Sequence, residues 1–162
     1  MANKYHYAFY CLLIVLLQLS GCASVSKTPF SMQSNNPAVA TALQLQGHPY
    51  VIGGESPAEG FDCSGLVYYV YQQHGVSLPR DAWSQAHELP MVDAEQRQPG
   101  DLVFFNTGYH AFSHVGIYLG ANKFVHAPSD NGKVMVSDLN HPYWKRRFSA
   151  VRRPRHPSRH LN

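Results

Sequence analysis

The local pattern of this sequence changes from helical to β near residue 98, and this change constrains the fold more than any other feature. Before it, Asn36, Asp62 and Asp81 each stand where a capping residue begins a predicted helix. After it, short apolar runs alternate with turn residues. Helices first and strands afterwards predict an α+β fold, in which helices pack on an antiparallel sheet.

Cap and turn residues bound the predicted elements. The helices run from Pro37 toward Gly47, from just after Asp62 toward Gly75, and from just after Asp81 toward Glu88. The predicted strands are 102–105, 114–119, 123–127, 134–136 and 148–151. The second and third of these strands form a predicted hairpin, joined by Gly120-Ala121-Asn122.

The composition suits one globular domain. The chain has 162 residues, of which 44% are hydrophobic and 14% are charged, so it can bury a core and is not compositionally disordered. We expect the domain at residues 36–153. A flexible tether rich in Ser, Thr, Asn and Gln would precede it at 22–35, and a basic tail would follow at 154–162.

Residues 1–21 have the pattern of a secretory signal. Lys4 supplies a positive start, and Ala8 to Leu19 form an apolar stretch too short to span a bilayer as a helix. The stretch ends in Leu19-Ser20-Gly21-Cys22, which resembles the lipobox of bacterial lipoproteins. That resemblance implies an acylated Cys22 and a membrane anchor; an ordinary signal peptide with a coincidental cysteine is the alternative.

The residue after the cysteine bears on location. Ala23 stands where a signal for retention in the inner membrane would usually place Asp. By the same resemblance, we expect the protein at the periplasmic face of the outer membrane in a Gram-negative envelope.

Basic residues crowd the C-terminal end, although the net charge is only +3. After position 144 they are Lys145, Arg146, Arg147, Arg152, Arg153, Arg155 and Arg159. Such a segment can bind nucleic acid, anionic lipid or an anionic polymer, or it can be a solvated terminus. No interleaved aromatic pattern or zinc-finger spacing accompanies it, so we expect no nucleic-acid partner.

One cysteine of three is left for the folded domain, because Cys11 would leave with the signal and Cys22 would carry the lipid. A lone thiol in an exported protein needs an explanation, since exported proteins usually pair their cysteines. Cys63 is either a buried inert residue or a functional one. Its position in the first turn of a predicted helix predicts a lowered thiol pKa, because the helix start stabilises a thiolate.

Two histidines lie on the predicted hairpin. If Leu119 pairs with Lys123, the numbers of paired residues sum to 242, so His114 and His126 share one face and lie diagonally across from each other. A cysteine, a general base and an orienting group need such an arrangement. A metal site is the alternative, but further ligands at convincing spacing are missing from the sequence.

Several ordered blocks resemble the signatures of NlpC-type cell-wall peptidases. They are Phe61-Asp62-Cys63-Ser64-Gly65-Leu66-Val67, Pro99-Gly100-Asp101-Leu102-Val103-Phe104-Phe105, His114-Val115-Gly116-Ile117-Tyr118 and Val125-His126-Ala127. The resemblance covers about residues 44–151. It implies a papain-like fold with the cysteine helix packed against the sheet, and it matches Cys63 to the nucleophile, His114 to the base and His126 to the residue that orients the base.

The same resemblance suggests a set of substrate-binding residues. Tyr50 matches a tyrosine near the oxyanion position, and Asp62 a position associated with a substrate amine; a core aromatic and a helix cap are the alternative roles. Ser64 and Arg80 are weaker candidates for the substrate groove. Val51 and Ile52 depart from the family pattern, which often has polar and aromatic residues there, so fine substrate preference is in doubt.

The resemblance implies hydrolysis of amide bonds in the stem peptides or cross-links of peptidoglycan by a Cys-His-His thiol mechanism. Two alternatives remain open: a non-catalytic lipoprotein that binds cell wall or a partner, and a cysteine acyltransferase with the same residues. No nucleotide or cofactor motif occurs in the sequence, so we expect neither a cofactor nor a metal. We expect a monomer.

Overall fold

The computed structural model describes residues 36–130 and 132–155. The predicted signal, Cys22, the tether at 22–35 and most of the basic tail lie outside the described residues. The helices are α2 (Pro37–Gln44), α3 (Cys63–Gln72), α4 (Ala82–Glu88) and α5 (Pro142–Arg147), with a short 3₁₀ turn at Ala94–Gln96. The strands are β1 (Glu55–Ser56), β2 (Gly60–Phe61), β3 (Met91–Val92), β4 (Leu102–Phe105), β5 (His114–Gly120), β6 (Lys123–His126), β7 (Met135–Asp138) and β8 (Phe148–Arg152).

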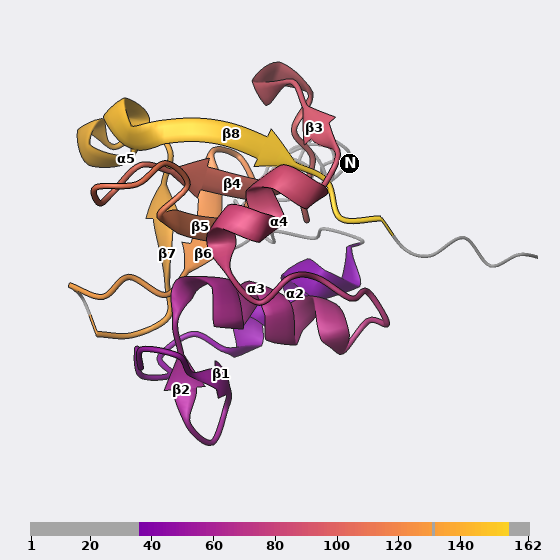
Figure 1. The fold of residues 1–162 in the computed structure, drawn as a ribbon, viewed down its shortest axis with the longest axis vertical. Helices are drawn as coiled ribbons and strands as arrows, with labels where there is room; N and C mark the ends of the chain where they lie inside the picture. Colours follow the sequence, from indigo (N-terminus) through magenta and orange to yellow (C-terminus); the bar gives the residue numbers. More distant parts are fainter. Residues whose placement is uncertain (1–35, 131, 156–162) are drawn as a thin grey trace, which may run out of the picture. The chain divides into compact units, whose positions relative to one another are not determined.

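Six of these strands form one antiparallel sheet in the order β3-β8-β4-β5-β6-β7, and β1 pairs with β2 separately. The predicted α+β fold is therefore confirmed. The helices come first along the chain and the sheet follows, except for α5 near the end (Figure 1). Strand β5 lies inside the sheet, between β4 and β6, so its first residue, His114, is held by a neighbour.

The two faces of the sheet are covered differently. Helices α2, α3 and α4 pack on one face, where their apolar side chains join Val115, Ile117 and Val125 in the larger core cluster. Figure 1 shows α2 and α3 lying against each other below the sheet. On the other face a smaller cluster of Tyr118, Phe124 and their neighbours packs against Trp144 of α5. The larger cluster fixes α3 against β5, and thereby places the residue at the start of α3.

The predicted caps form as expected. Asn36 accepts a hydrogen bond from the backbone N–H of Ala38, Asp62 from Gly65 and Asp81 from Ser84. These side chains satisfy N–H groups that have no partner inside the helix. The first helix ends at Gln44, three residues before the predicted stop at Gly47.

The hairpin has the predicted alternation of faces and a tighter loop. Ile117 pairs with Val125 and Tyr118 with Phe124, so the paired numbers sum to 242, but a bulge brings Gly120 opposite Lys123. Ala121 and Asn122 both have positive φ, 47° and 58°, as a two-residue hairpin turn requires. The bulge lies beyond Tyr118, so it leaves both histidines on the face expected for them.

Several elements differ from the prediction. The two-residue strands β1, β2 and β3 and the helix α5 were not predicted. The interpretation of the last basic residues as a solvated terminus is wrong for two of them. Arg152 is buried and donates to the backbone oxygen of Ala86, and Arg153 forms an ion pair with the buried Asp101 at 2.7 Å. Within 36–130 and 132–155, no helix is long and apolar enough to cross a membrane.

Candidate active site

Cys63 is the first residue of α3, directly after the capping residue Asp62. Its side chain lies between helix and sheet, where the backbone N–H of Val115 in β5 bonds to the sulfur. The N–H groups of Ser64 and of Cys63 itself also face the sulfur. Because Val115 directly follows His114, this contact places the thiol beside the start of β5.

The prediction that the Cys63 pKa is lowered is wrong. Burial raises the pKa of the thiol, and the nearby Asp62 carboxylate raises it further, which outweighs the N–H groups of Val115, Ser64 and Cys63. The N–H groups at the helix start do lower the pKa of the thiol, but burial has the larger effect, and the sequence alone does not show burial. In the resting protein Cys63 is therefore a thiol, and its proton has to leave during the reaction.

The two histidines are joined as the hairpin geometry predicted. His114 Nε2 lies 2.8 Å from His126 Nδ1, and His126 Nε2 lies 2.8 Å from the hydroxyl oxygen of Ser137 in β7. His114 and His126 are buried, with 7% and 0% of their surfaces exposed. The contacts form a chain across three neighbouring strands, β5, β6 and β7, that ends at a hydroxyl group.

This chain of contacts couples the proton positions on the two rings. The Ser137 hydroxyl either accepts from His126 Nε2–H, in which case His114 donates to His126 through its own Nε2–H, or donates to His126 Nε2, in which case His114 Nε2 accepts. Only in the first arrangement does Nδ1 of neutral His114 carry a free lone pair. A base that takes a thiol proton needs such an unprotonated nitrogen.

Burial keeps both imidazoles neutral. It lowers the pKa of His114 to about 4, although the Asp130 carboxylate acts in the opposite direction. The pKa of His126 is lowered by burial and by its neighbour His114. Trp144 adds to this enclosure, since its ring is stacked on His114 at 5.4 Å between centroids and meets His126 edge-on at 4.8 Å. The thiol and both imidazoles are therefore uncharged in the resting protein.

A glycine makes room for the histidine pair. Gly116 lies opposite His126 in the hairpin, and a Cβ atom there would come within 2.8 Å of the Val125 carbonyl oxygen and 3.1 Å of the His126 Cβ. Both distances are shorter than ordinary van der Waals contact. The side chain of His126 can approach His114 because residue 116 has none.

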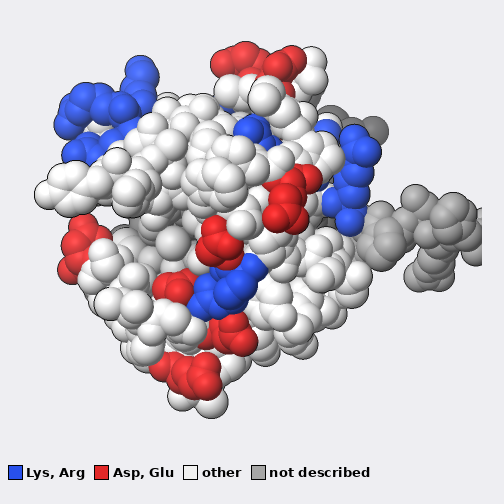
Figure 2. Space-filling model, viewed as in Figure 1, with Lys and Arg blue, Asp and Glu red and all other residues white. Residues whose placement is uncertain are grey.

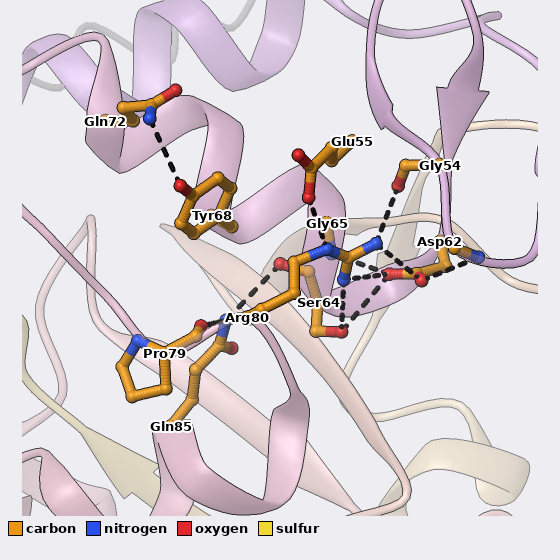
Figure 3. Close-up of polar contacts among 11 residues, drawn as sticks. Gly54, Glu55, Asp62, Ser64, Gly65, Tyr68, Gln72, Pro79, Arg80 and Gln85 are labelled. Atoms are coloured by element: carbon orange, nitrogen blue, oxygen red, sulfur yellow. Dashed lines mark hydrogen bonds and ion pairs between the residues drawn. The ribbon is translucent and has the colours of Figure 1, made fainter.

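Three of the predicted substrate-binding residues, Asp62, Ser64 and Arg80, belong to a charged cluster at the start of α3. Figure 3 shows Arg80 at its centre, with Glu55, Asp62 and Ser64 around the guanidinium group. Arg80 Nε donates to Glu55 at 2.6 Å, and Arg80 Nη2 to Asp62 at 2.9 Å. The guanidinium also donates to the carbonyl oxygen of Gly54 at 3.1 Å. Arg80 thus joins the loop before β1 to the start of α3.

Within this cluster the Asp62 carboxylate is saturated. It accepts five hydrogen bonds: one each from the N–H groups of Gly53 and Gly65, one from the Ser64 hydroxyl and two from Arg80. Burial alone would raise the pKa of Asp62, but the bonds from Arg80 and Gly65 hold it below its usual value. Asp62 is therefore ionised. The helix cap is observed, and the binding of a substrate amine by Asp62 stays a prediction.

Tyr50 and Gly65 complete the surroundings of the thiol. Burial raises the pKa of Tyr50, and negative charge at Cys63, when its thiol is ionised, and at Asp62 raises it further. Gly65 faces the Gly54 carbonyl oxygen, and a Cβ atom there would clash with that oxygen and with Arg80. Ser64 thus follows Cys63 in α3, and Arg80 reaches the start of that helix through its hydrogen bonds to Asp62 and Ser64.

A basic patch lies outside the site, on α5. The basic residues of α5, Lys145, Arg146 and Arg147, form a patch over that helix (Figure 2). Among the described residues, no group of three or more His, Cys, Asp and Glu side chains could hold a metal ion.

Comparison with known proteins identifies the family. Residues 47–153 match the NlpC/P60 family. The chain belongs to this family. Its γ-DL-glutamyl hydrolase relative from Bacillus subtilis is 46% identical over 119 residues, which are 72% of this chain and 29% of that protein. The murein DD-endopeptidase MepH of Escherichia coli is 38% identical over 120 residues, 72% of this chain and 44% of that protein. The chain thus spans less than half the length of either relative.

A solved NlpC/P60 structure agrees with the fold. A protein from Staphylococcus aureus, described as similar to lipoprotein and as a member of the NLP/P60 family, superimposes with a TM-score of 0.69 at 35% identity. The superposition covers 90% of this chain and 48% of that one. The NlpC/P60 fold predicted from the sequence blocks is therefore confirmed.

Sequence reasoning missed three residues of this NlpC/P60 site. Ser137 lies eleven positions after His126, and the pairing of β6 with β7 brings the two together. Asp130 belongs to the connection between these strands, and Trp144 to α5. Only Trp144 had a usable signal, because Pro142 stands at the first position of its helix, where proline is favoured.

Proposed function

We propose that the protein is a peptidoglycan endopeptidase that cleaves amide bonds of stem peptides or cross-links, with Cys63 as the nucleophile. The observation that carries this proposal is the hydrogen-bonded chain of His114, His126 and Ser137, which begins one residue before Val115, whose backbone N–H is directed toward the sulfur of Cys63. Relatives in the family are named as a γ-DL-glutamyl hydrolase and a murein DD-endopeptidase, which supports the class of substrate.

In the first half of the reaction, the sulfur of Cys63 attacks the carbonyl carbon while His114 Nδ1 takes the thiol proton. In this proposal the developing oxyanion receives hydrogen bonds from backbone N–H groups at the start of α3, and the Tyr50 hydroxyl is a further donor. The bond from carbon to nitrogen then breaks as His114 returns the proton to the leaving amine. A thioester on Cys63 remains.

In the second half, His114 takes a proton from a water molecule, and the resulting hydroxide attacks the thioester carbon. The bond from carbon to sulfur breaks, the carboxylic acid product departs, and the proton returns to the sulfur. His126 holds the His114 ring in one orientation and tautomer throughout. The neutral resting pair suits this cycle, because each half begins with a base that carries no proton on Nδ1.

We further propose that a lipid on Cys22 holds the enzyme at the periplasmic face of the outer membrane, beside its substrate. The lipobox-like sequence before Cys22 and Ala23 after it support this location. The tether at 22–35 would set how far the domain reaches into the wall.

Peptidoglycan digestion tests the proposed activity. Purified protein is incubated with peptidoglycan, and the released muropeptides are identified by mass spectrometry, which also reveals the bond that is cut. We expect release by the parent protein and none by Cys63→Ala. Equal release by both proteins would contradict the assignment of Cys63, and release by neither would contradict the proposed activity.

A further inference from the structure

An exposed aromatic surface lies on the outer side of α4. Trp83 and His87 are four residues apart, so they share one face of the helix, and Gln85 between them lies on the opposite face. Trp83 is 57% exposed, whereas Gln85 is fully buried. The outer face of α4 therefore presents an indole ring to solvent.

Neighbouring rings hold this indole in place. The His87 ring is stacked on Trp83 at 3.9 Å between centroids, and His87 Nδ1 lies 2.7 Å from the backbone oxygen of Trp83. Phe112 meets the His87 ring edge-on at 5.3 Å. Because His87 covers one face of the indole, the exposed surface belongs to the other face and the edges. These three rings, the Trp83 platform, lose little conformational entropy when a ligand stacks on them.

The polar atoms at the edges of the platform are available to a ligand. A carbonyl oxygen can only accept, so His87 donates to it through Nδ1–H, and Nε2 of the neutral ring is an acceptor. The Trp83 Nε1–H group is a donor. None of the three side chains is a carboxylate, an ammonium or a guanidinium group. The platform thus offers an apolar face with one donor and one acceptor.

The platform borders both halves of the active site. Gln85, on the inner face of α4, donates to the backbone oxygen of Ser64 at 3.3 Å (Figure 3). Ser64 directly follows Cys63 in α3. Phe112 stands two residues before His114, the first residue of β5. A ligand on the platform would therefore lie beside the segments that carry the nucleophile and the base.

The proposed substrate has a second component besides its peptide. In peptidoglycan the amino end of each stem peptide is attached to a glycan of N-acetylated amino sugars. An extended stem of about four residues keeps the sugar within about 14 Å of the cleaved bond. One face of a pyranose ring consists of C–H groups that pack on an aromatic ring, and the acetamido group has one N–H donor and one carbonyl acceptor. These groups match those of the platform.

We propose that the Trp83 platform binds an N-acetylated amino sugar of the glycan strand while the stem peptide lies at Cys63. The inference rests on the proposed peptidase activity. An uncharged sugar suits this surface better than the stem peptide does, because the peptide carries ionised carboxyl groups. Trp83 would thus contribute to substrate binding away from the reacting atoms.

Kinetics on two matched substrates measure this contribution. One is a muropeptide with its disaccharide, and the other is the same peptide with an acetyl group in place of the sugar, so that neither has a free amino end. An aromatic contact of this kind is worth about fivefold in KM. We expect the parent protein to have a KM lower by about that factor for the muropeptide, with equal kcat for both substrates. Trp83→Ala should show a KM ratio near one with kcat unchanged.

Two further variants control this comparison. Trp83→Tyr retains an aromatic ring and should retain most of the preference. Met91→Ala removes another large apolar side chain, which is 76% exposed and lies on β3 outside the platform, and it should keep the preference of the parent. Equal KM values for both substrates in the parent, or a preference that survives Trp83→Ala, would overturn the platform.

A binding experiment separates this inference from the proposed activity. An oligomer of N-acetylglucosamine without peptide is titrated into the parent protein, and NMR records the indole N–H signals of Trp83 and Trp144, the two tryptophans of the chain. A shift confined to the Trp83 signal supports the platform even if the protein cleaves no muropeptide; that result would contradict only the proposed activity. No shift, equal shifts of both signals, or a Trp83 shift with phosphatidylglycerol vesicles but not with the oligomer would overturn the platform as a sugar site.

Discussion

The two sides of the active site are held together by different means. On the thiol side, Asp62 and Arg80 carry full charges, are partly open to solvent and are joined by several hydrogen bonds to the start of α3. On the histidine side, His114 and His126 are buried and neutral, and His114 Nε2 shares one hydrogen bond with His126 Nδ1. Charge is used where solvent and many donors stabilise it, and neutral hydrogen bonds are used where burial would penalise charge.

This difference explains why the reactive groups begin uncharged. Burial raises the pKa of Cys63 and the negative charge of Asp62 raises it further, while burial in the strands lowers the pKa of both histidines. A thiolate–imidazolium pair is disfavoured at both ends. Substrate binding would therefore precede the transfer of the proton, and variants on the two sides should fail in different ways.

The largest effect is expected from the histidine side. In His126→Ala, the His114 ring loses the acceptor that fixes its tautomer, and we expect kcat to fall about 10³-fold with KM nearly unchanged. His126→Asn retains an oxygen that can accept from His114 and should recover part of the loss. Steady-state kinetics on a defined muropeptide measure both. A rise in KM with unchanged kcat would assign His126 to substrate binding instead.

The pH dependence of stability also reports on the histidine side. A buried histidine whose pKa is about 4 takes up a proton on unfolding wherever the pH is below about 6.5, so the unfolded state binds more protons between these values. The contribution of His114 to the free energy of unfolding should therefore rise by about 3 kcal/mol from pH 4 to pH 6.5, and His126, whose pKa is also lowered, adds to the rise. Urea denaturation across this range measures it.

The control for this pH dependence is His114→Gln, which cannot titrate in the window and should show a smaller slope. The lowered pKa of Asp62 acts below this range, because an aspartate titrates near 3.9 in the unfolded chain. An equal slope in the parent and in His114→Gln would assign the effect to other groups.

A stability change should mark the thiol side. Arg80→Met leaves Glu55 and Asp62 without their cation, and we expect a loss of about 2 kcal/mol in the free energy of unfolding, less than for a fully buried pair because the cluster is partly exposed. Arg80→Lys keeps the positive charge but lacks the planar guanidinium group that donates to two acceptors at once. Its free energy of unfolding should therefore lie between those of the parent and Arg80→Met. Equal stability of parent and Arg80→Met, measured by urea denaturation, would show that the cluster is not structural.

The smallest effect is expected at the end of the histidine chain. Ser137→Ala removes the acceptor for His126 Nε2–H, which allows His126 to take the other tautomer, and we expect kcat to fall about tenfold. Ser137→Thr retains the hydroxyl and should retain most of the activity. If the alanine and threonine variants lost activity equally, packing at Ser137 rather than its hydroxyl would be responsible.

Much of this site follows from local sequence signals. Asp62 marks the start of α3 and hence places Cys63 in a first helical turn, because a helix cap depends on a few neighbouring residues. The alternation of side chains along β5 and β6 places His114 and His126 on one face without knowledge of the rest of the fold. Both inferences use spacing alone, and both are confirmed.

The remainder depends on packing between distant segments. The pKa of Cys63 is raised because α3 and β5 exclude solvent, and no local pattern gives the extent of burial. Arg80 contacts Glu55, which is 25 residues away, and Trp144 of α5 reaches back to His114. The contact of Ser137 with His126 depends on how β7 pairs with β6, and the sequence of β7 alone does not give that register.

The most direct test of this account is the protonation of the two histidines in the resting protein. ¹⁵N NMR of the ring nitrogens at pH 7 distinguishes imidazolium from each neutral tautomer. We predict that His114 and His126 are both neutral, with the proton on Nε2 in each ring. An imidazolium at His114, or a proton on Nδ1 of His126, would contradict the neutral chain that runs from Ser137 through His126 to His114.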